Sequence, residues 1–355
     1  MDNVPISGLP ELHAHLQELV NDAALPINAK LLDDVELQLT EDNIPPLLPT
    51  LLPPLSQILR STSQDPTPLL SLTIKLLTPL SLPQALALAD PPSLLTALRS
   101  PLPGANLLAL AILHKAAGSA ADAALLSTLP EVVEELVRRW LESPDVGVGE
   151  RAAKVLGDML EVDCDVVEAN GCSASQATGS ELVKRRAPGH ARLWHLILQS
   201  RPNLSLIQYL CTPDEKERRS MRDVTISQGR VLRLLPRLCA LNIGPLSQTL
   251  FADIFLVPAA TARETGQGLL QWAALAMVDK SDVLMHLNLI DFFETLVSII
   301  RVSDSSPRKH VTVKNLVKAA VRADQDLESA LRTLPDRTVE EEAEALRRYI
   351  VDLLA

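Results

Sequence analysis

Aromatic residues, glycine and excess positive charge are all scarce in this chain of 355 residues. Only three Trp, two Tyr and four Phe are present and none precedes Trp140, so the first third must pack with aliphatic side chains alone. Thirteen glycines are too few for the many tight turns of an all-β sandwich or barrel. With 44 acidic and 33 basic residues the formal net charge is −11, which argues against a nucleic-acid binder that works through bulk charge.

The sequence also lacks a visible export or membrane signal. Its first residues have neither the basic nor the apolar region of a secretory signal peptide. The uncharged stretch 44–59 contains five prolines and is shorter than the roughly 20 residues of a membrane-spanning helix. We therefore expect a soluble protein of the cytoplasm, with the nucleus as a second compartment, that binds no membrane. In such a compartment Cys164, Cys172, Cys211 and Cys239 are expected to be free, buried thiols.

Helical periodicity is what the sequence has in abundance. In residues 150–161 the apolar side chains fall on one stripe and the charged ones on the opposite stripe. No segment shows sustained alternation with a period of two, so strands are not expected.

Short patterns recur at similar distances along the chain. The three pairs are 58–61 with 97–100 at an offset of 39, 98–101 with 141–144 at 43, and 241–243 with 287–289 at 46. These offsets lie close to the 40–47 residues typical of HEAT and armadillo units, in which each helical unit must stack on its neighbours to bury its apolar face. The sequence therefore predicts an all-α, armadillo/HEAT-like helical-repeat solenoid.

Composition suggests where this solenoid is divided. Of 26 prolines, 16 lie within residues 1–103, so 1–139 is expected to hold irregular, Pro-rich repeats and 140–301 more regular ones. A polar loop is expected over 169–190, and a second break at 302–307 would separate the solenoid, 1–301, from a C-terminal helical segment, 302–355. Thr338 and Glu341 form a capping-box pattern that would open the last helix, ending at Leu354.

No pattern of residues points to catalysis. Gly147 to Ala152 matches the loose dinucleotide-binding fingerprint, but a helix end precedes it where the motif requires a strand, so a turn between helices is the favoured interpretation. His13 and His15 have no further metal ligand at a recognised spacing. The carboxylates beside Cys164 oppose the thiolate that a nucleophile requires. We expect no enzymatic activity, no cofactor, no metal, no small-molecule substrate and no nucleic acid, but a protein partner.

Several stretches between Pro144 and Arg301 are similar to a known family. They are GERAAKVLGD at 149–158, LWHLIL at 193–198, RLLPRL at 233–238, and DVLMH at 282–286 with IDFF at 290–293. They resemble the fungal members of the proteasome regulatory-particle assembly chaperones of the non-ATPase subunit 5 type, some of which are labelled as mismatch-repair or mutability proteins. The resemblance implies an armadillo/HEAT-like solenoid without enzymatic activity. It also implies that the solenoid binds the C-terminal domain of a proteasomal ATPase subunit during assembly of the regulatory-particle base. Family members are usually longer beyond the position of Arg301, and residues 305–355 show no clear likeness.

Two other functions stay open: a generic helical-repeat scaffold or adaptor for protein–protein interaction, and a DNA mismatch-repair accessory protein, for which a basic stripe is missing. In armadillo-like units the final helix of each repeat lines the concave side, which here predicts helices 149–161 and 289–301. Their polar stripes are expected to face outward. The candidate partner-binding residues are Glu150, Lys154, Asp158, Glu161, Asp291, Glu294, Thr295 and Ser298.

Overall fold

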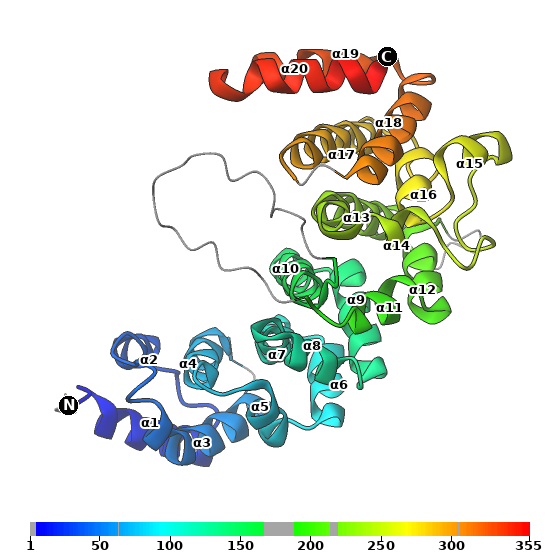
Figure 1. The fold of residues 1–355 in the computed structure, drawn as a ribbon. Coiled ribbons are helices and arrows are strands. Elements are labelled where there is room, and N and C mark those ends of the chain that lie inside the picture. Colours follow the sequence, from blue (N-terminus) through cyan, green and yellow to red (C-terminus); the bar gives the residue numbers. More distant parts are fainter. Residues whose placement is uncertain (1–4, 63, 167–187, 214–218, 304–305) are drawn as a thin grey trace. The chain divides into compact units, whose positions relative to one another are not determined.

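The computed structural model describes residues 5–62, 64–166, 188–213, 219–303 and 306–355. Over these ranges the chain forms α-helices, short 3-10 helices and an isolated β-bridge between Gln248 and Gln267, and no strand (Figure 1). The prediction of an all-α, helical-repeat fold is confirmed. Cys172, most of the polar loop expected over 169–190 and part of the break expected at 302–307 lie outside the described residues.

The chain divides into two compact units, 1–115 and 116–355. The division therefore falls neither after 139 nor after 301, where the composition changes. The reason is packing: α9 (Pro130–Glu142) contacts α10 (Val146–Asp163) in the second unit. At the other end, α18 (Pro307–Val321) contacts α17 (Val283–Val302), so residues 302–355 are not separate.

The first unit is a stack of short helices that begin at prolines. They are α1 (Leu9–Asn21), α2 (Ala29–Glu36), η1 (Pro45–Leu47), α3 (Leu48–Ser61), α4 (Thr67–Leu77), α5 (Leu82–Leu88), α6 (Pro91–Arg99) and α7 (Pro103–His114). Every α-helix in this set except α2 has a proline at its first or second position. A proline there removes no intrahelical hydrogen bond, because the N–H groups at the start of a helix have no partner within it. Equivalent helices pack together, α1 on α3 and α2 on α4, followed by α4 on α7.

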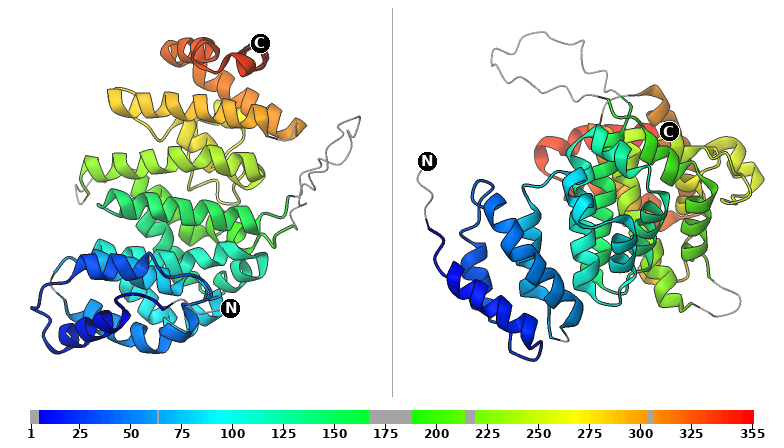
Figure 2. Two further views of the ribbon diagram at one scale, coloured as in Figure 1. Left: turned by 90° about the vertical axis from the view of Figure 1, so that its left-hand side faces the viewer. Right: turned by 90° about the horizontal axis from the view of Figure 1, so that it is seen from below.

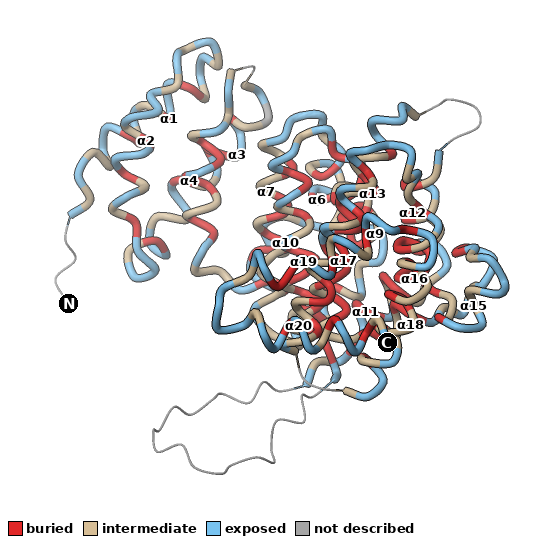
Figure 3. The backbone as a smooth tube through the Cα atoms, turned by 90° about the horizontal axis from the view of Figure 1, so that it is seen from above, coloured by how far each residue is buried: buried red, intermediate tan, exposed pale blue. Residues whose placement is uncertain are grey.

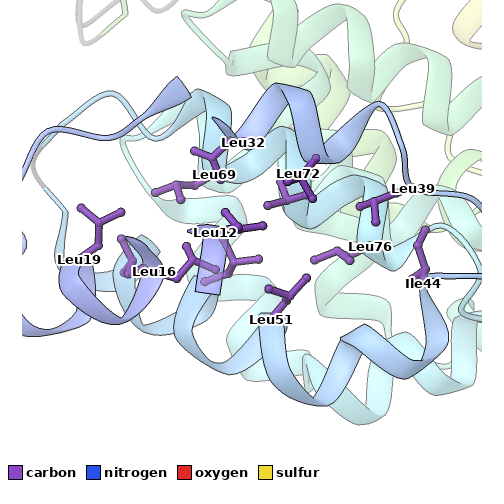
Figure 4. Close-up of a cluster of buried hydrophobic side chains, with 13 residues drawn as sticks. Leu12, Leu16, Leu19, Leu32, Leu39, Ile44, Leu51, Leu69, Leu72 and Leu76 are labelled. Carbon is purple, nitrogen blue, oxygen red and sulfur yellow. The ribbon is translucent and has the colours of Figure 1, made fainter. Parts of the chain in front are cut away.

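The core of the first unit is aliphatic, as the absence of aromatics requires. Leu12 and Leu16 of α1, Leu51 of α3, and Leu72 and Leu76 of α4 have no exposed surface and point into one cluster (Figure 4). Burial of one such side chain stabilises a fold by about 1.5–3 kcal/mol. Repeated leucine burial is therefore what holds these short helices together.

The second unit has two layers of helices. One layer contains α9, α12 (Arg201–Cys211), α16 (Leu269–Leu275) and α18, and the other contains α10, α13 (Met221–Asn242) and α17 (Figure 1). Buried positions lie along the sides of these helices that face one another (Figure 3). The remaining elements are α8 (Ala120–Leu126), α11 (Arg192–Leu198), α14 (Gly244–Ser247), α15 (Ala259–Thr265), α19 (Gln325–Thr333), η3 (Leu334–Arg337) and α20 (Glu340–Leu354), with η2 (Lys115–Gly118) at the division between the units.

Helices α10, α13 and α17 run parallel and lie side by side (Figure 2, left). Across the first interface Arg230 lies beside Gly149 and Arg237 beside Gly157, so residue numbers rise together. Across the second interface, Gly229 lies beside Asn288. Parallel packing of successive second helices is the arrangement of a helical repeat.

Two of the three repeat offsets relate equivalent helices. The patterns at offset 39 end α3 and α6, and those at offset 43 end α6 and α9. The offset of 46 is wrong, because residues 241–243 lie at the end of α13 whereas 287–289 lie inside α17. The structure instead brings Gly229 next to Asn288, an offset of 59, and the third match reflects only the abundance of leucine in both helices.

The last helix ends at Leu354 as predicted, but the predicted capping box does not form. The N-cap is Val339, which makes no side-chain cap, and the Thr338 hydroxyl donates to Leu334 O (3.0 Å). Because the helix begins at Glu340, Glu341 falls at its second position rather than its third.

Buried polar side chains donate hydrogen bonds to the carbonyls at the ends of α9 and of α6, its counterpart in the first unit. Arg230 of α13 is 8% exposed and donates from Nη1 to Leu141 O (3.0 Å) and from Nη2 to Asp145 O (3.3 Å). In the first unit Asn106 of α7 donates to the equivalent carbonyl, Leu98 O (2.9 Å). At the offset of 43 the counterpart of Asn106 is Gly149 of α10, which has no amide side chain to offer. The carbonyl at the end of α9 is therefore bound by the Arg230 guanidinium of α13 instead.

We predict that two Gly→Ala substitutions have opposite effects on stability. A Cβ at Gly149 would meet Arg230 Nη2 at 2.2 Å and displace a guanidinium that holds two carbonyls, whereas at Gly229 the nearest atom is 4.0 Å away. Gly149→Ala should destabilise the protein by about 1–2 kcal/mol, and Gly229→Ala, which removes only backbone freedom, should stabilise it by about 0.5–1 kcal/mol. Urea unfolding of both variants checks this, and a stabilising Gly149→Ala would contradict the packing described.

Candidate protein-interaction face

All eight predicted partner-binding residues lie on α10 or α17, on the side of the second unit formed by α10, α13 and α17. We call this side the α10–α13–α17 face. The two predicted helices, 149–161 and 289–301, are not neighbours, because α13 lies between them and packs against both (Figure 2, left). The face is therefore one helix wider than predicted, and its middle helix supplies arginines.

The acidic residues predicted on α10 are neutralised by these arginines. Glu150 is paired with Arg233, and Arg237 Nη2 donates to Asp158 (2.7 Å) and Glu161 (2.6 Å). Lys154 of α10 also pairs with Asp158 (2.9 Å), so Lys154, Asp158, Glu161 and Arg237 form one network of ion pairs. The prediction that these side chains simply face outward is wrong for Asp158, which is only 19% exposed.

The electrostatics of this network favour the charged guanidinium. Burial disfavours the charge of Arg237, but the hydrogen bonds that it donates to the carboxylates of Glu161 and Asp158 raise the pKa of its guanidinium above the ordinary value. At Arg230, which has only carbonyl partners, burial lowers the pKa of the guanidinium instead. The arginines thus hold α10 and α13 in register as well as charging the face.

Two predicted residues of α17 make contacts within the chain. The Glu294 carboxylate accepts from Arg337 of η3 (2.6 Å) and is 15% exposed. The Ser298 hydroxyl donates to Glu294 O (2.8 Å). The Glu294–Arg337 pair ties α17 to η3, whereas the Ser298 hydrogen bond lies within α17 itself.

Asp291 and Thr295, in contrast, line a cavity between α13 and α17. Its volume is about 60 Å³, and its lining residues are Gly229, Leu232, Arg233, Pro236, Asn288, Asp291, Phe292 and Thr295. Asp291 is exposed and forms no ion pair with any residue that the structure describes. It is the one predicted acid of the face whose charge is not matched in this way within the described chain.

The cavity follows from two helix-weakening residues of α13. Gly229 has no side chain to fill the space beside Asn288. Pro236, inside the helix, has no N–H, so the carbonyl of Leu232 loses its usual donor four residues later. Gly229, Pro236 and Leu232 all line the cavity, so the space and the residue with the unmatched carbonyl occur at the same part of α13.

The arginines and the cavity are what sequence reasoning missed. A signal was present, because Arg233 and Arg237 are four residues apart and Glu150, Asp158 and Glu161 lie on a second helix at matching spacing. Pairing them required the register of α13 on α10, which no local pattern contains.

The other titratable clusters are structural. Asp324 caps α19 and accepts from Lys280 (2.8 Å) and His286 (2.9 Å). Although burial acts in the opposite direction, the hydrogen bond from Lys280 and those from Leu327 and His286 lower the pKa of the Asp324 carboxyl. Its charge therefore ties α17 to α19 and has no open position for a substrate.

Neither metal ligation nor a reactive thiol is apparent in the described ranges. Among these residues no group of three His, Cys, Asp or Glu side chains is placed to hold a metal ion. Cys211 and Cys239 are free and fully buried, and burial raises the pKa of both thiols, while Cys164 is buried with its Sγ 3.8 Å from Leu241 O. Gly147 and Gly149 lie in the first turns of α10, behind the Asp145 cap, so the prediction that residues 147–152 form a turn between helices is wrong. The end of α9 and a short turn do precede them, where the dinucleotide-binding motif requires a strand.

Of the described helices, α17 alone is long and apolar enough, by length and composition, to cross a membrane. Its buried side chains, such as Phe292, Phe293 and Leu296, pack against α13, α18, α19 and α20. A core helix passes the same test, and packing accounts for the apolar residues of α17 that are buried, whereas Val283, Leu284, Leu287 and Val302 are exposed.

No family model matches the chain, and no curated protein is similar to it. The resemblance of the stretches on α10, α11, α13 and α17 to assembly chaperones stays a prediction.

We predict that charge reversal separates the paired acids of the face from Asp291. Reversing Asp158 and Glu161 to Lys would place like charges around Arg237 and should destabilise the protein by about 1–3 kcal/mol. Asp291→Lys, at an exposed residue without an ion pair in the described chain, should change stability by less than about 0.5 kcal/mol. Thermal unfolding at low ionic strength measures both, and equal losses would contradict the pairing.

Proposed function

We propose that the chain is a non-catalytic protein that binds a protein partner on the α10–α13–α17 face. The observation that carries this proposal is the continuous surface of three parallel helices, with a cavity and an unmatched carboxylate at its centre. Two other candidates in the described chain have structural roles: Asp324 caps α19 and forms an ion pair with Lys280, and Cys211 and Cys239 are buried thiols. Stacked helices provide extended binding surfaces of this kind.

Within that class we propose a chaperone for assembly of the proteasome regulatory-particle base, which binds the C-terminal domain of an ATPase subunit in the cytoplasm, with the nucleus as a second compartment. Support comes from where the family-like stretches fall. Residues 149–158 lie on α10 and 233–238 on α13; 282–286, which begins at the Asp282 N-cap, and 290–293 belong to α17, and 193–198 lies on α11. The resemblance therefore falls on all three helices of the candidate face and, in addition, on α11, which is not part of that face.

Charge favours a basic or mixed partner. The net charge of −11 would attract such a partner and increase its association rate. It disfavours the DNA-repair alternative, since Arg233, Arg237 and Arg337 on or beside the face are each paired with carboxylates. A generic scaffold or adaptor is the second candidate, and the choice of partner distinguishes it.

The test uses the purified full chain and the C-terminal domain of each proteasomal ATPase subunit in turn, with binding measured by calorimetry. One domain should bind, and Asp291→Lys should weaken that binding at least about tenfold, or 1.4 kcal/mol, without loss of thermal stability. The matched control is Asp34→Lys, because Asp34 is an exposed aspartate of α2 in the other unit.

Failure of every domain to bind would overturn the chaperone proposal. Binding that Asp291→Lys and Asp34→Lys leave equally unchanged would place the interface away from the α10–α13–α17 face.

A further inference from the structure

The cavity between α13 and α17 combines features that select a particular ligand group. It is lined by apolar groups of Leu232, Pro236 and Phe292 and by polar groups of Asn288, Asp291 and Thr295. Its volume of about 60 Å³ is several times the ~15 Å³ that one water requires. A methylene chain with a small polar end fits such a combination better than a bulky or wholly apolar side chain.

We propose that this cavity binds the ammonium end of a lysine side chain, and, on the proposed function, that this lysine belongs to the partner protein. An ammonium group has three donors and no acceptor. Asp291, with its carboxylate, and Thr295, with its hydroxyl, line the cavity, and so does Leu232, whose carbonyl lacks its helical donor because of Pro236. The last methylenes of the lysine would lie against Leu232 and Phe292.

The charge balance around the cavity supports a cation. Arg233 also lines it, but its guanidinium is paired with Glu150 of α10. The local set of Glu150, Arg233 and Asp291 therefore sums to −1. The other three acids of the face, Asp158, Glu161 and Glu294, are matched by Lys154, Arg237 and Arg337. Asp291 is therefore where an incoming positive charge gains most.

The geometry also explains why glycine and proline occur inside α13. Gly229 and Pro236 are seven residues apart, so they lie on the same side of the helix and open the two ends of one cavity. In an ordinary helix such residues lower stability, by roughly 0.5–1 kcal/mol for glycine and about 3 kcal/mol for proline. Two destabilising residues at one cavity are expected if the cavity is a binding site, because they create the space that the ligand occupies.

The test titrates the ¹⁵N-labelled full chain with Nα-acetyl-lysine methylamide, whose ε-ammonium is free, and follows the NMR signals of the Gly229 amide and the Asn288 side-chain amide. Two comparison probes are Nα-acetyl-norleucine methylamide, which lacks the ammonium, and Nα-acetyl-glutamate methylamide, which is anionic. We expect saturable shifts with the lysine probe only. Asp291→Asn should weaken this binding at least tenfold, and Asp34→Asn should leave it unchanged.

A second variant, Gly229→Met, should fill the cavity and abolish the shifts at Asn288, while thermal unfolding verifies that the protein remains folded. Absence of saturable shifts, equal shifts with norleucine, or preference for the glutamate probe would overturn the proposal, the last of these in favour of an anion at Arg233. Lysine binding without capture of any ATPase domain would leave the cavity assignment standing and reject the proposed partner. Capture of an ATPase domain without binding of the lysine probe would leave the proposed partner standing and reject the assignment of the cavity.

Discussion

Two arginines of α13 occupy the space that two glycines leave on α10, and the arrangement of the second unit depends on this contact. A Cβ at Gly149 would meet the Arg230 guanidinium at 2.2 Å, and one at Gly157 would meet Arg237 Nη1 at 2.4 Å. Glycines eight residues apart face arginines seven residues apart, which only a parallel pair in one register allows. That register also turns Gly229 and Pro236 toward α17, and so it places the cavity.

The same contact solves a problem that every stacked helix pair has. The carbonyls at a helix end have no intrahelical partner and are costly to bury without a donor. Asn106 supplies the donor from within its own pair, whereas Arg230 and Gln228 reach across to other helices. Gln228 Nε2 donates to Cys211 O (2.8 Å), at the end of α12, and to Met277 O (2.9 Å), just after the end of α16. Buried polar groups therefore fix how each repeat meets the next, while leucines supply most of the stabilisation.

Local pattern was enough to predict much of this fold. The stripe of 150–161 predicts a helix whose Ala152, Val155 and Leu156 are buried, and all three are. The offsets of 39 and 43 identify real helix pairs because the turn residues that end α3, α6 and α9 recur. The offset of 46 fails because leucines at helical spacing match one another in any register.

The sequence predicts which residues of α10 and α17 lie on one side of the unit but not which groups they contact. The polar residues of α10 and α17 do lie on one side of the unit, as their periodicity requires. Their partners do not follow from periodicity, since Glu150 and Arg233 are 83 residues apart in sequence and meet only through the packing of α13. Long-range ion pairs and the gap left by a glycine are properties of the assembled stack, and a single sequence has no local signal for them.

A double-mutant cycle between Gly149→Ala and Arg230→Met tests this dependence most directly. If the glycine is there to admit the guanidinium, removing the guanidinium should make the alanine harmless, or mildly stabilising through its helix propensity. The two losses in the free energy of unfolding should then differ from additivity by at least about 1 kcal/mol. Additivity within about 0.3–0.5 kcal/mol would show that the two residues act independently, and would contradict the account of how α10, α13 and the binding face are held in register.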